Sequence, residues 1–279
     1  MTKFQFTMII LILGIVGGIL GLYTYFVAEE KTTSATPPPS IGMSKEKVVE
    51  KETYEVLNTH TGEWELKWEE HFDQPELDLS KWIALDEKGL YNNEKQYYIY
   101  ENVEIANGIA SLIAKNEDYE GYAYTSGALS TKNKFSMLYG KLEVRAKFPV
   151  GKGLFSAIWM LPAKLEQLPE IDIMEVIGSE PDRVYMVNHW DSGGLKTVHD
   201  EAKVDPSKYH NYGIEWEENE LRYYIDDELV FRTQKGVPQE EMYLIINLAV
   251  GGNWPDDPNS STIFPSSFDI EHVKVYEKR

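Results

Sequence analysis

Cysteine is absent from this chain of 279 residues. Disulfide bonds and lipid attachment through a cysteine are therefore excluded. If the protein is exported, its fold does not depend on disulfide cross-links. The sequence also shows no internal repeat, no glycine-rich phosphate loop and, in its C-terminal three quarters, no helical periodicity. Repeat architectures and phosphate-loop nucleotide-binding folds are thus disfavoured.

Positive charge is scarce. The chain has 27 Lys and Arg residues against 46 Asp and Glu residues, a formal net charge of −19, and nearly all of the excess falls in residues 63–279. Proteins that bind nucleic acid need a basic face to meet the phosphates. Nucleic-acid binding is therefore disfavoured, whereas an uncharged ligand is compatible with this field.

One long apolar run is present, at the N-terminus. Residues 4–28 carry no charge and are long enough to cross a bilayer as one helix. The alternative is a cleavable signal, whose apolar core usually has about 7 to 15 residues and ends in an A-x-A-like site. Here the bulky Phe26 stands where a small residue is expected, two before Ala28. We predict an uncleaved transmembrane anchor in residues 1–28 and an extracytoplasmic protein, which would be secreted if the segment were cleaved.

A linker is predicted in residues 29–62. Its first part, 32–40, is a Thr/Ser/Pro-rich stretch, and mixed charges follow. Such composition cannot bury a core and favours extended chain. The segment therefore indicates a tether between the anchor and a folded domain, with a short helix at 44–55 as an open alternative.

Residues 63–279 indicate one all-β domain. Alternating apolar and polar runs, separated by Gly, Asn, Asp and Pro turns, occur at 108–114, 140–148, 220–231 and 270–276. Many short strands with turn signals between them are typical of a β-sandwich. With no heptad or dimer signature, the domain is predicted to be a monomer.

Three carboxylates stand close together in one apolar strand. In a regular strand Glu170 and Asp172 share a face and Glu175 points to the other. A β-bulge near Ile173 or Met174 would turn Glu175 onto the face of the other two. Two carboxyl groups about 5 to 5.5 Å apart are the catalytic pair of a retaining glycosidase. The competing interpretation is a half-exposed strand whose acids only face water.

Several blocks around these acids resemble glycoside hydrolase family 16, specifically its laminarinase-like endo-β-1,3-glucanases. The resemblance covers about residues 63–279, and the family's ordered acid motif in its bulged form, E-x-D-x-x-E, is its most specific part. The matching blocks are 92–98 (NNEKQYY), 101–103 (ENV), 125–127 (TSG), 139–147 (YGKLEVRAK), 153–162 (GLFSAIWMLP), 209–216 (YHNYGIEW) and 247–255 (NLAVGGNWP).

The resemblance implies a fold and three catalytic roles. The fold is a jelly-roll sandwich of two curved antiparallel sheets, of the concanavalin A-like lectin and glucanase type, with a cleft across the concave face. Glu170 is implied as the nucleophile, Glu175 as the acid/base, and Asp172 as the assisting residue between them. Elementary electrostatics agrees, because a neighbouring negative charge favours the protonated form that Glu175 needs.

Substrate-binding residues are implied in the same way. Sugar rings present flat C–H faces and hydroxyl rims, so a glycan site needs aromatic platforms beside polar side chains, and aromatics make up 13% of this chain. Core packing is the alternative for each aromatic, and we prefer it for Trp64, Trp68, Trp82 and Trp216. The implied set is Trp159, Arg145, Asn92, Asn93, His189, Phe155, Trp190, Asn247 and Trp254. Phe155 stands where the family usually has Trp, which makes one platform smaller.

No cofactor is implied for catalysis, but the family often carries a structural calcium ion. Glu70, the carbonyl of Gly108 and Glu271 are its implied ligands, because Ca²⁺ prefers several oxygen atoms. His71 stands here where the family usually has Glu.

Three functions remain open at this point. The first is a retaining endo-glycosidase that cuts β-1,3 bonds in laminarin-type glucan, or also mixed β-1,3-1,4-glucan. The second is a transglycosylase with the same residues, in which a sugar rather than water reaches the glycosyl-enzyme. The third is a membrane-tethered glucan-binding or sensor module, which would have no need of Glu170 and Glu175.

Overall fold

The computed structural model describes residues 64–89, 92–165 and 167–279. The predicted anchor at 1–28, the linker at 29–62 and the helix considered at 44–55 all lie outside these residues. Within them, the only helical element is the 3-10 turn η1 (Tyr100–Asn102). No helix of the described part has the length and apolarity needed to cross a bilayer.

An antiparallel sheet of eight strands forms the first layer. Its order is β16-β15-β14-β9-β18-β6-β5, and β1 pairs with β18. Its strands are β1 (Trp64–Glu70), β5 (Val103–Ala106), β6 (Ile109–Ala114), β9 (Gly140–Lys147), β14 (His210–Glu217), β15 (Glu220–Ile225), β16 (Glu228–Thr233) and β18 (Ser266–Lys278).

A second antiparallel sheet of seven strands carries the three acids, in the order β13-β12-β11-β10-β17-β8-β2. Its strands are β2 (Ile83–Ala84), β8 (Ala128–Ser130), β10 (Leu154–Pro162), β11 (Glu170–Ile177), β12 (Arg183–Asp191), β13 (Leu195–Lys203) and β17 (Met242–Val250). A small third sheet contains β3 (Glu87–Lys88), β4 (Gln96–Tyr98) and β7 (Tyr124–Ser126), of which β4 and β7 run parallel.

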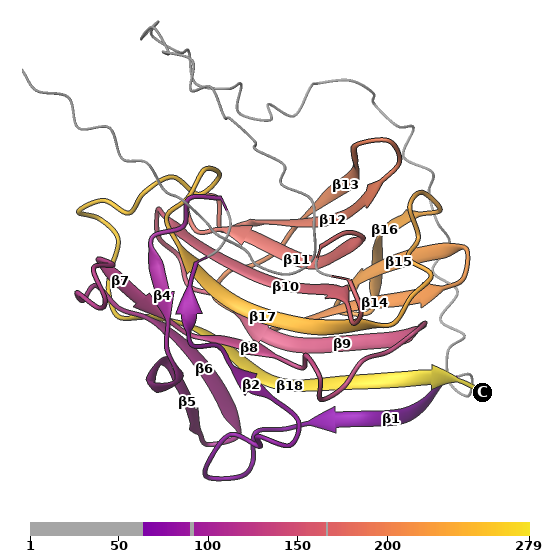
Figure 1. Ribbon diagram of the computed structural model, residues 1–279, viewed down its shortest axis with the longest axis horizontal. Coiled ribbons are helices and arrows are strands. Elements are labelled where there is room, and N and C mark those ends of the chain that lie inside the picture. Colours follow the sequence, from indigo (N-terminus) through magenta and orange to yellow (C-terminus); the bar gives the residue numbers. More distant parts are fainter. Residues whose placement is uncertain (1–63, 90–91, 166) are drawn as a thin grey trace, which may run out of the picture. The chain divides into compact units, whose positions relative to one another are not determined.

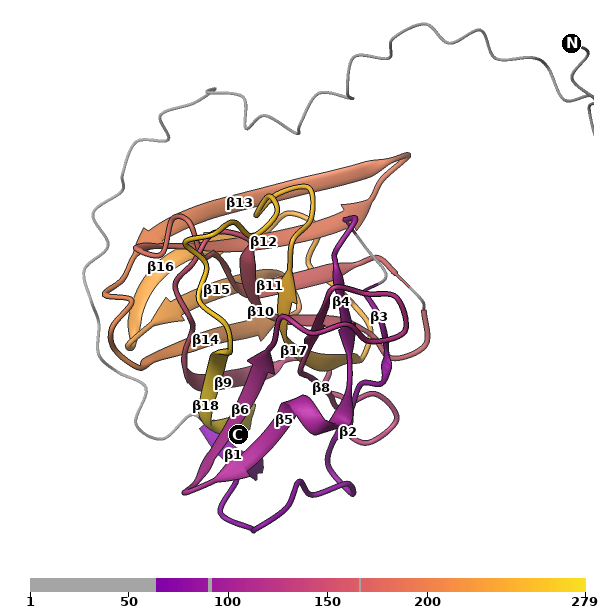
Figure 2. The same ribbon diagram turned by 90° about the vertical axis from the view of Figure 1, so that its left-hand side faces the viewer.

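The hydrophobic core lies between the two large sheets. In β9 the apolar residues Leu142, Val144 and Ala146 are buried, while the alternate charged residues are half-exposed. They join one cluster with residues of the other sheet such as Ile158 and Ile246. Figure 1 shows β10 and β17 of one layer lying beside β9 and β18 of the other, and Figure 2 shows the same layers from the side. The predicted all-β sandwich of antiparallel sheets is confirmed.

One predicted strand proves to be two. The alternating run at 220–231 is a hairpin of β15 and β16 rather than a continuous strand. Asp226 and Asp227 both have positive φ, 50° and 65°. Two successive residues of that conformation make the tight turn whose twist suits a hairpin, and Asp is among the residues that tolerate it.

The tryptophans assigned to the core follow that prediction with one exception. Trp82 and Trp216 are fully buried, and Trp68 packs against the main cluster. Trp64, at the start of β1, is half-buried like Trp68 but is not among the residues packed against that cluster.

Candidate active site

The bulge predicted in the acid strand is present in β11. Opposite β10, Ile158 pairs with Met174 and the next residue, Trp159, pairs with Asp172, so Ile173 is one residue extra. The pairing with β12 shifts at the same place, between Asp172 and Glu175. As a result two consecutive apolar residues, Ile173 and Met174, both enter the core.

The extra residue brings the three acids to one face, the face that points away from the core. Glu175 lies opposite Ala157 and Tyr185 on the neighbouring strands, while Glu170 lies opposite His189. Asp172 between them is only 2% exposed, and Glu170 and Glu175 are half-buried. Three carboxylates on one sheet face, so little exposed, are not the solvated acids of the competing interpretation.

Burial raises the pKa values of all three acids, and repulsion by neighbouring carboxylates adds to it for Asp172 and Glu175. The pKa of Glu175 rises to about 8 through burial and then through the charge of Glu170. Burial raises the pKa of Glu170 to about 7, against which a hydrogen bond with Asp172 acts. Asp172 has its pKa raised well above its usual range by burial and by both glutamates. The environment of Asp172 therefore favours its protonated form, and of the two glutamates Glu175 keeps its proton to the higher pH.

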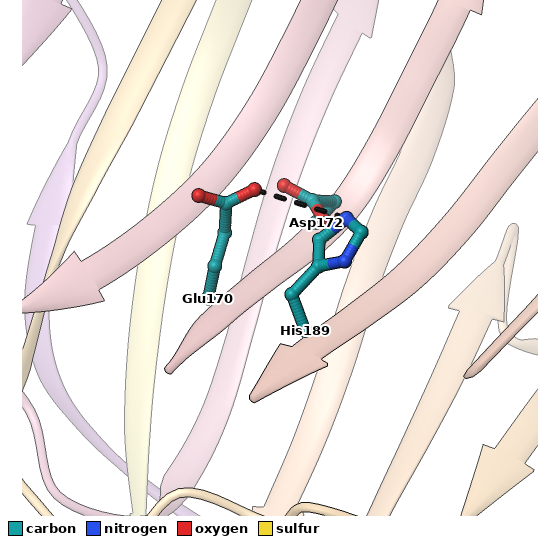
Figure 3. A group of neighbouring side chains, drawn as sticks. All are labelled: Glu170, Asp172 and His189. Carbon is teal, nitrogen blue, oxygen red and sulfur yellow. Dashed lines mark ion pairs between the residues drawn. The ribbon is translucent and has the colours of Figure 1, made fainter. Parts of the chain in front are cut away.

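His189 faces the same acids from β12 (Figure 3). Its Nε2 lies 3.6 Å from Oδ2 of Asp172 and 4.0 Å from Oε1 of Glu170. On its other side Nδ1 lies 2.7 Å from the hydroxyl of Thr197 on β13. Burial, and then the nearby His199, lower the pKa of His189. The ring is therefore neutral near pH 7 and is held with Nε2 toward the carboxylates.

Trp159 lies beside the acids and is held by a hydrogen-bonded chain. It pairs with Asp172 across the strands, and its indole Nε1 donates to Oδ1 of Asn247 at 2.7 Å. The amide of Asn247 in turn donates to the hydroxyl of Tyr98 at 3.0 Å. The indole is half-buried, so part of it remains accessible on the face that carries the acids.

We expect Tyr98→Phe to weaken substrate binding. Without the hydroxyl, the buried amide of Asn247 loses its acceptor, at a cost of about 1 kcal/mol, and the indole of Trp159 loses its fixed orientation. KM for glucan should rise several-fold while kcat changes little, as measured by steady-state kinetics. Tyr97→Phe is the control, because the ring of this neighbouring residue contacts Tyr119 and Tyr122 at steep angles instead. Equal KM values in the two variants would contradict the role of this chain.

A second aromatic group lies on the same face. Trp254 contacts Tyr185 and Phe155 edge-on, with ring centroids 4.9 Å and 5.6 Å apart, and Tyr185 is the residue opposite Glu175. Trp254 remains 41% exposed. Phe155 and Trp254, predicted separately as sugar platforms, are therefore in contact with each other near the acid/base candidate.

Asn92 and Asn93 line a loop beside this group. The backbone carbonyl of Asn92 accepts from N–H of Asn253, and the side chain of Asn93 donates to Oδ1 of Asn253, both at 2.8 Å. These bonds join the loop to the segment just before Trp254. The side-chain amide of Asn93 therefore already has a partner within the protein. Asn93 positions the segment before Trp254 in addition to its predicted role as a sugar contact.

Arg145 and Trp190, both predicted to bind substrate, do not lie with the acids. Arg145 is on β9 of the other sheet, on its outer face, where Nε donates to Glu271 at 2.5 Å and the guanidinium covers Tyr209. The alternation that made it a candidate could not show which sheet it would join. Trp190 is one residue from His189 and so faces the opposite side of β12, where its ring packs on Gly236.

The implied calcium ligands do not assemble in the structure. Glu70 is buried, one of its oxygens accepts two backbone N–H groups, and the other pairs with Lys81 at 3.3 Å. Glu271 is paired with Arg145 instead. Each carboxylate already has its own cation, and a hollow of about 450 Å³ beside Glu70 is not lined by Gly108 or Glu271. These residues do not fit a shared calcium ion, and no step of the chemistry is built on one.

Several site residues escaped the sequence analysis. Tyr185, Thr197 and His199 reach the acid-bearing face through strand pairing, and Tyr98 reaches it from the third sheet through its hydrogen bond with Asn247. Tyr98 belongs to a block of the resemblance, so its position was a usable signal. Thr197 and His199 lie on an exposed strand without apolar alternation, and no local pattern distinguishes them.

The pH dependence of kcat/KM should follow the two glutamates. Glu170 must be ionised to attack, so activity rises as pH passes about 7, and Glu175 must be protonated, so activity falls as pH passes about 8. Because the three acids interact, the apparent pKa values of the two limbs describe the coupled group of acids and not single residues. Initial rates on glucan between pH 5 and 10 measure this profile. A plateau extending above pH 9 would contradict the role of Glu175 as the acid.

Known proteins share this architecture. The model of glycosyl hydrolases family 16 matches residues 88–264. A β-glucanase of Rhodothermus marinus is 35% identical over 254 residues, which span 76% of this chain and 85% of that protein. Glucan endo-1,3-β-glucosidase A1 of Niallia circulans is 32% identical over 261 residues, 77% of this chain and 38% of that protein. The catalytic domain of an endo-1,3-β-glucanase (laminarinase) from Thermotoga petrophila RKU-1 superposes with a TM-score of 0.72 at 33% identity, covering 78% of this chain and 99% of that domain.

Proposed function

Because the chain belongs to family 16 of the glycosyl hydrolases, we propose that it hydrolyses β-1,3-glucosidic bonds within laminarin-type glucan, with retention of configuration. The observation that carries this proposal is the bulged strand β11, which aims Glu170, Asp172 and Glu175 from one sheet face. Relatives named as β-glucanase and endo-1,3-β-glucosidase support the choice of substrate.

In the first half-reaction Glu170 attacks the anomeric carbon and Glu175 protonates the departing glycosidic oxygen. Asp172, protonated in its buried position, donates to Glu170 and stabilises the ionised form that attacks. Trp159 offers a flat, half-exposed ring beside the reacting pair on which a sugar can stack.

In the second half-reaction water replaces the sugar on Glu170. The covalent bond has removed the charge of Glu170, and that charge was one of the two causes of the raised pKa of Glu175. The pKa of Glu175 therefore falls once the intermediate forms, so Glu175 can accept a proton from water as general base. One carboxyl group serves both steps, and no cofactor takes part.

Location and substrate range extend this proposal. An anchor in residues 1–28 and a tether in 29–62 would hold the domain outside the membrane, and the apolar run without charges at 4–28 supports this. A net charge of −19 suits a neutral glucan better than a sulfated or uronic-acid polymer. Mixed β-1,3-1,4-glucan is the second substrate to test, since a relative from Rhizobium meliloti is named endo-1,3-1,4-β-glycanase.

The deciding experiment measures reducing ends released from laminarin, lichenan, xyloglucan and agarose, with NMR of the first-formed anomer. We expect release from laminarin with the β-anomer first. An α-anomer first would overturn retention. If laminarin binds but no substrate is cut, a glucan-binding or sensor module replaces the enzyme, and longer oligosaccharides in place of hydrolysis products would indicate a transglycosylase.

A further inference from the structure

Three potential metal ligands converge at the acids. Glu170, Asp172 and His189 each offer one ligand atom, and these three atoms lie within 4.8 Å of one another (Figure 3). Nε2 is 3.6 Å from Oδ2 and 4.0 Å from Oε1. Ligand atoms bound tetrahedrally to Zn²⁺ at about 2.0 to 2.2 Å stand about 3.4 Å apart. Small side-chain rotations therefore suffice to place all three around one ion.

Asp172 adds a separate observation. Its side chain is buried, and its Oδ2 has no hydrogen-bond partner although it is the oxygen that faces His189. Buried polar atoms are nearly always partnered, so such an atom calls for an explanation. A cation between Oδ2 and Nε2 would supply the missing partner.

His189 is held in the orientation that a metal ligand needs. Nδ1 is 2.7 Å from the hydroxyl of Thr197, and a proton on Nδ1 that is donated there leaves the lone pair of Nε2 free toward the carboxylates. Metal-binding histidines generally have such a partner on their second nitrogen. The chain has no cysteine that could compete for a thiophilic ion.

We propose that Glu170, Asp172 and His189 bind one divalent transition-metal ion such as Zn²⁺, and that the bound ion blocks glucan hydrolysis. The block rests on the proposed function, because the ion would engage the oxygen with which Glu170 attacks. One imidazole with two carboxylates suits Zn²⁺ or Co²⁺. Ca²⁺ takes six to eight oxygen ligands and Mg²⁺ a near-octahedral shell, so neither should bind here.

Binding is tested without reference to activity. Zn²⁺ is titrated into the full-length protein by calorimetry, and Co²⁺ is followed by its visible absorption. We expect one ion to bind at this site. The affinity should fall at least about tenfold in His189→Ala. It should fall about tenfold in Thr197→Val, which keeps the three ligands but removes the hydroxyl that contacts Nδ1 of His189. Unchanged affinity in His189→Ala would overturn the site.

A second pair of histidines provides the control. The rings of His71 and His272 are 5.7 Å apart, and they pair with Glu69 and Glu143. His272→Ala should leave the affinity for Zn²⁺ and the glucanase activity unchanged. Zinc binding that is lost in His272→Ala and kept in His189→Ala would place the ion at this second pair and refute the proposal.

The block is measured as laminarin hydrolysis at rising Zn²⁺, Ca²⁺ or Mg²⁺. Zn²⁺ alone should inhibit, with a midpoint equal to its calorimetric dissociation constant, and a chelator should restore the rate. Full activity at saturating Zn²⁺ would refute the block. A protein that binds Zn²⁺ at His189 but never cuts laminarin would refute the proposed function and leave the metal site standing.

Discussion

Glu170→Gln should lower kcat for laminarin by at least about a thousandfold, because the neutral amide cannot attack the anomeric carbon. The amide has the size and shape of the carboxyl, so glucan should bind with nearly unchanged affinity. Glu170 already carries a burial penalty in its charged form, and its neutral replacement should leave the melting temperature equal or higher. Steady-state rates, calorimetric glucan binding and thermal unfolding measure the three effects.

Glu201→Gln is the matched control for this variant. Glu201 is an exposed acid on the edge strand β13 of the same sheet, ion-paired to Arg183 at 3.0 Å. Its neutralisation removes one charge from the same sheet without touching the three acids, and activity should stay within twofold. A similar loss in both variants would mean that general charge, not attack by Glu170, accounts for the effect.

Glu175→Gln should lose as much activity on laminarin but far less on an activated substrate. A glucosidic oxygen is a poor leaving group that needs a proton, whereas a nitrophenolate departs without one, so formation of the glycosyl-enzyme survives with an aryl β-glucoside. The second half-reaction still lacks its general base, so a burst of one nitrophenolate per enzyme should precede a slow steady state. Stopped-flow absorbance records this burst.

The comparison with Glu170→Gln makes the assignment specific. That variant cannot form the intermediate and should show no burst with the same aryl substrate. Should the burst occur in Glu170→Gln and not in Glu175→Gln, the two roles are exchanged. The falling limb of the pH profile should also vanish in Glu175→Gln, because the group that titrates at about 8 is gone.

Local pattern was enough to predict the sandwich and the acid group. Both depend on alternation along single strands, and even the bulge follows from the six residues 170–175 once the three acids are required to share a face. The alternation of β9 likewise fixed which of its residues enter the core.

Pattern failed where the answer depends on which strands become neighbours. Arg145 has the right side chain and a correctly predicted strand, yet that strand joins the sheet without the acids. The prediction for Trp190 is wrong because successive residues of a strand point to opposite faces, and its neighbour His189 occupies the face with the acids. Thr197 is the reverse case, an unremarkable residue that reaches the site because β13 pairs with β12. Pairing between distant strands is a tertiary property that composition and period do not encode.

The bulge in β11 acts as a spacer. A strand reading Glu-Ile-Asp-Met-Glu, with Ile173 deleted, would still present all three carboxylates outward by simple alternation, and Val176 would still point inward. In the actual strand the bulge keeps Glu175 on the face of the other two acids although one more residue separates it from Asp172; the path from Asp172 to Glu175 is longer by one residue while that of the opposing strand stays the same. Deletion of this one residue would thus shorten the strand between Asp172 and Glu175, while the residues before and after the bulge would keep the faces that they have now.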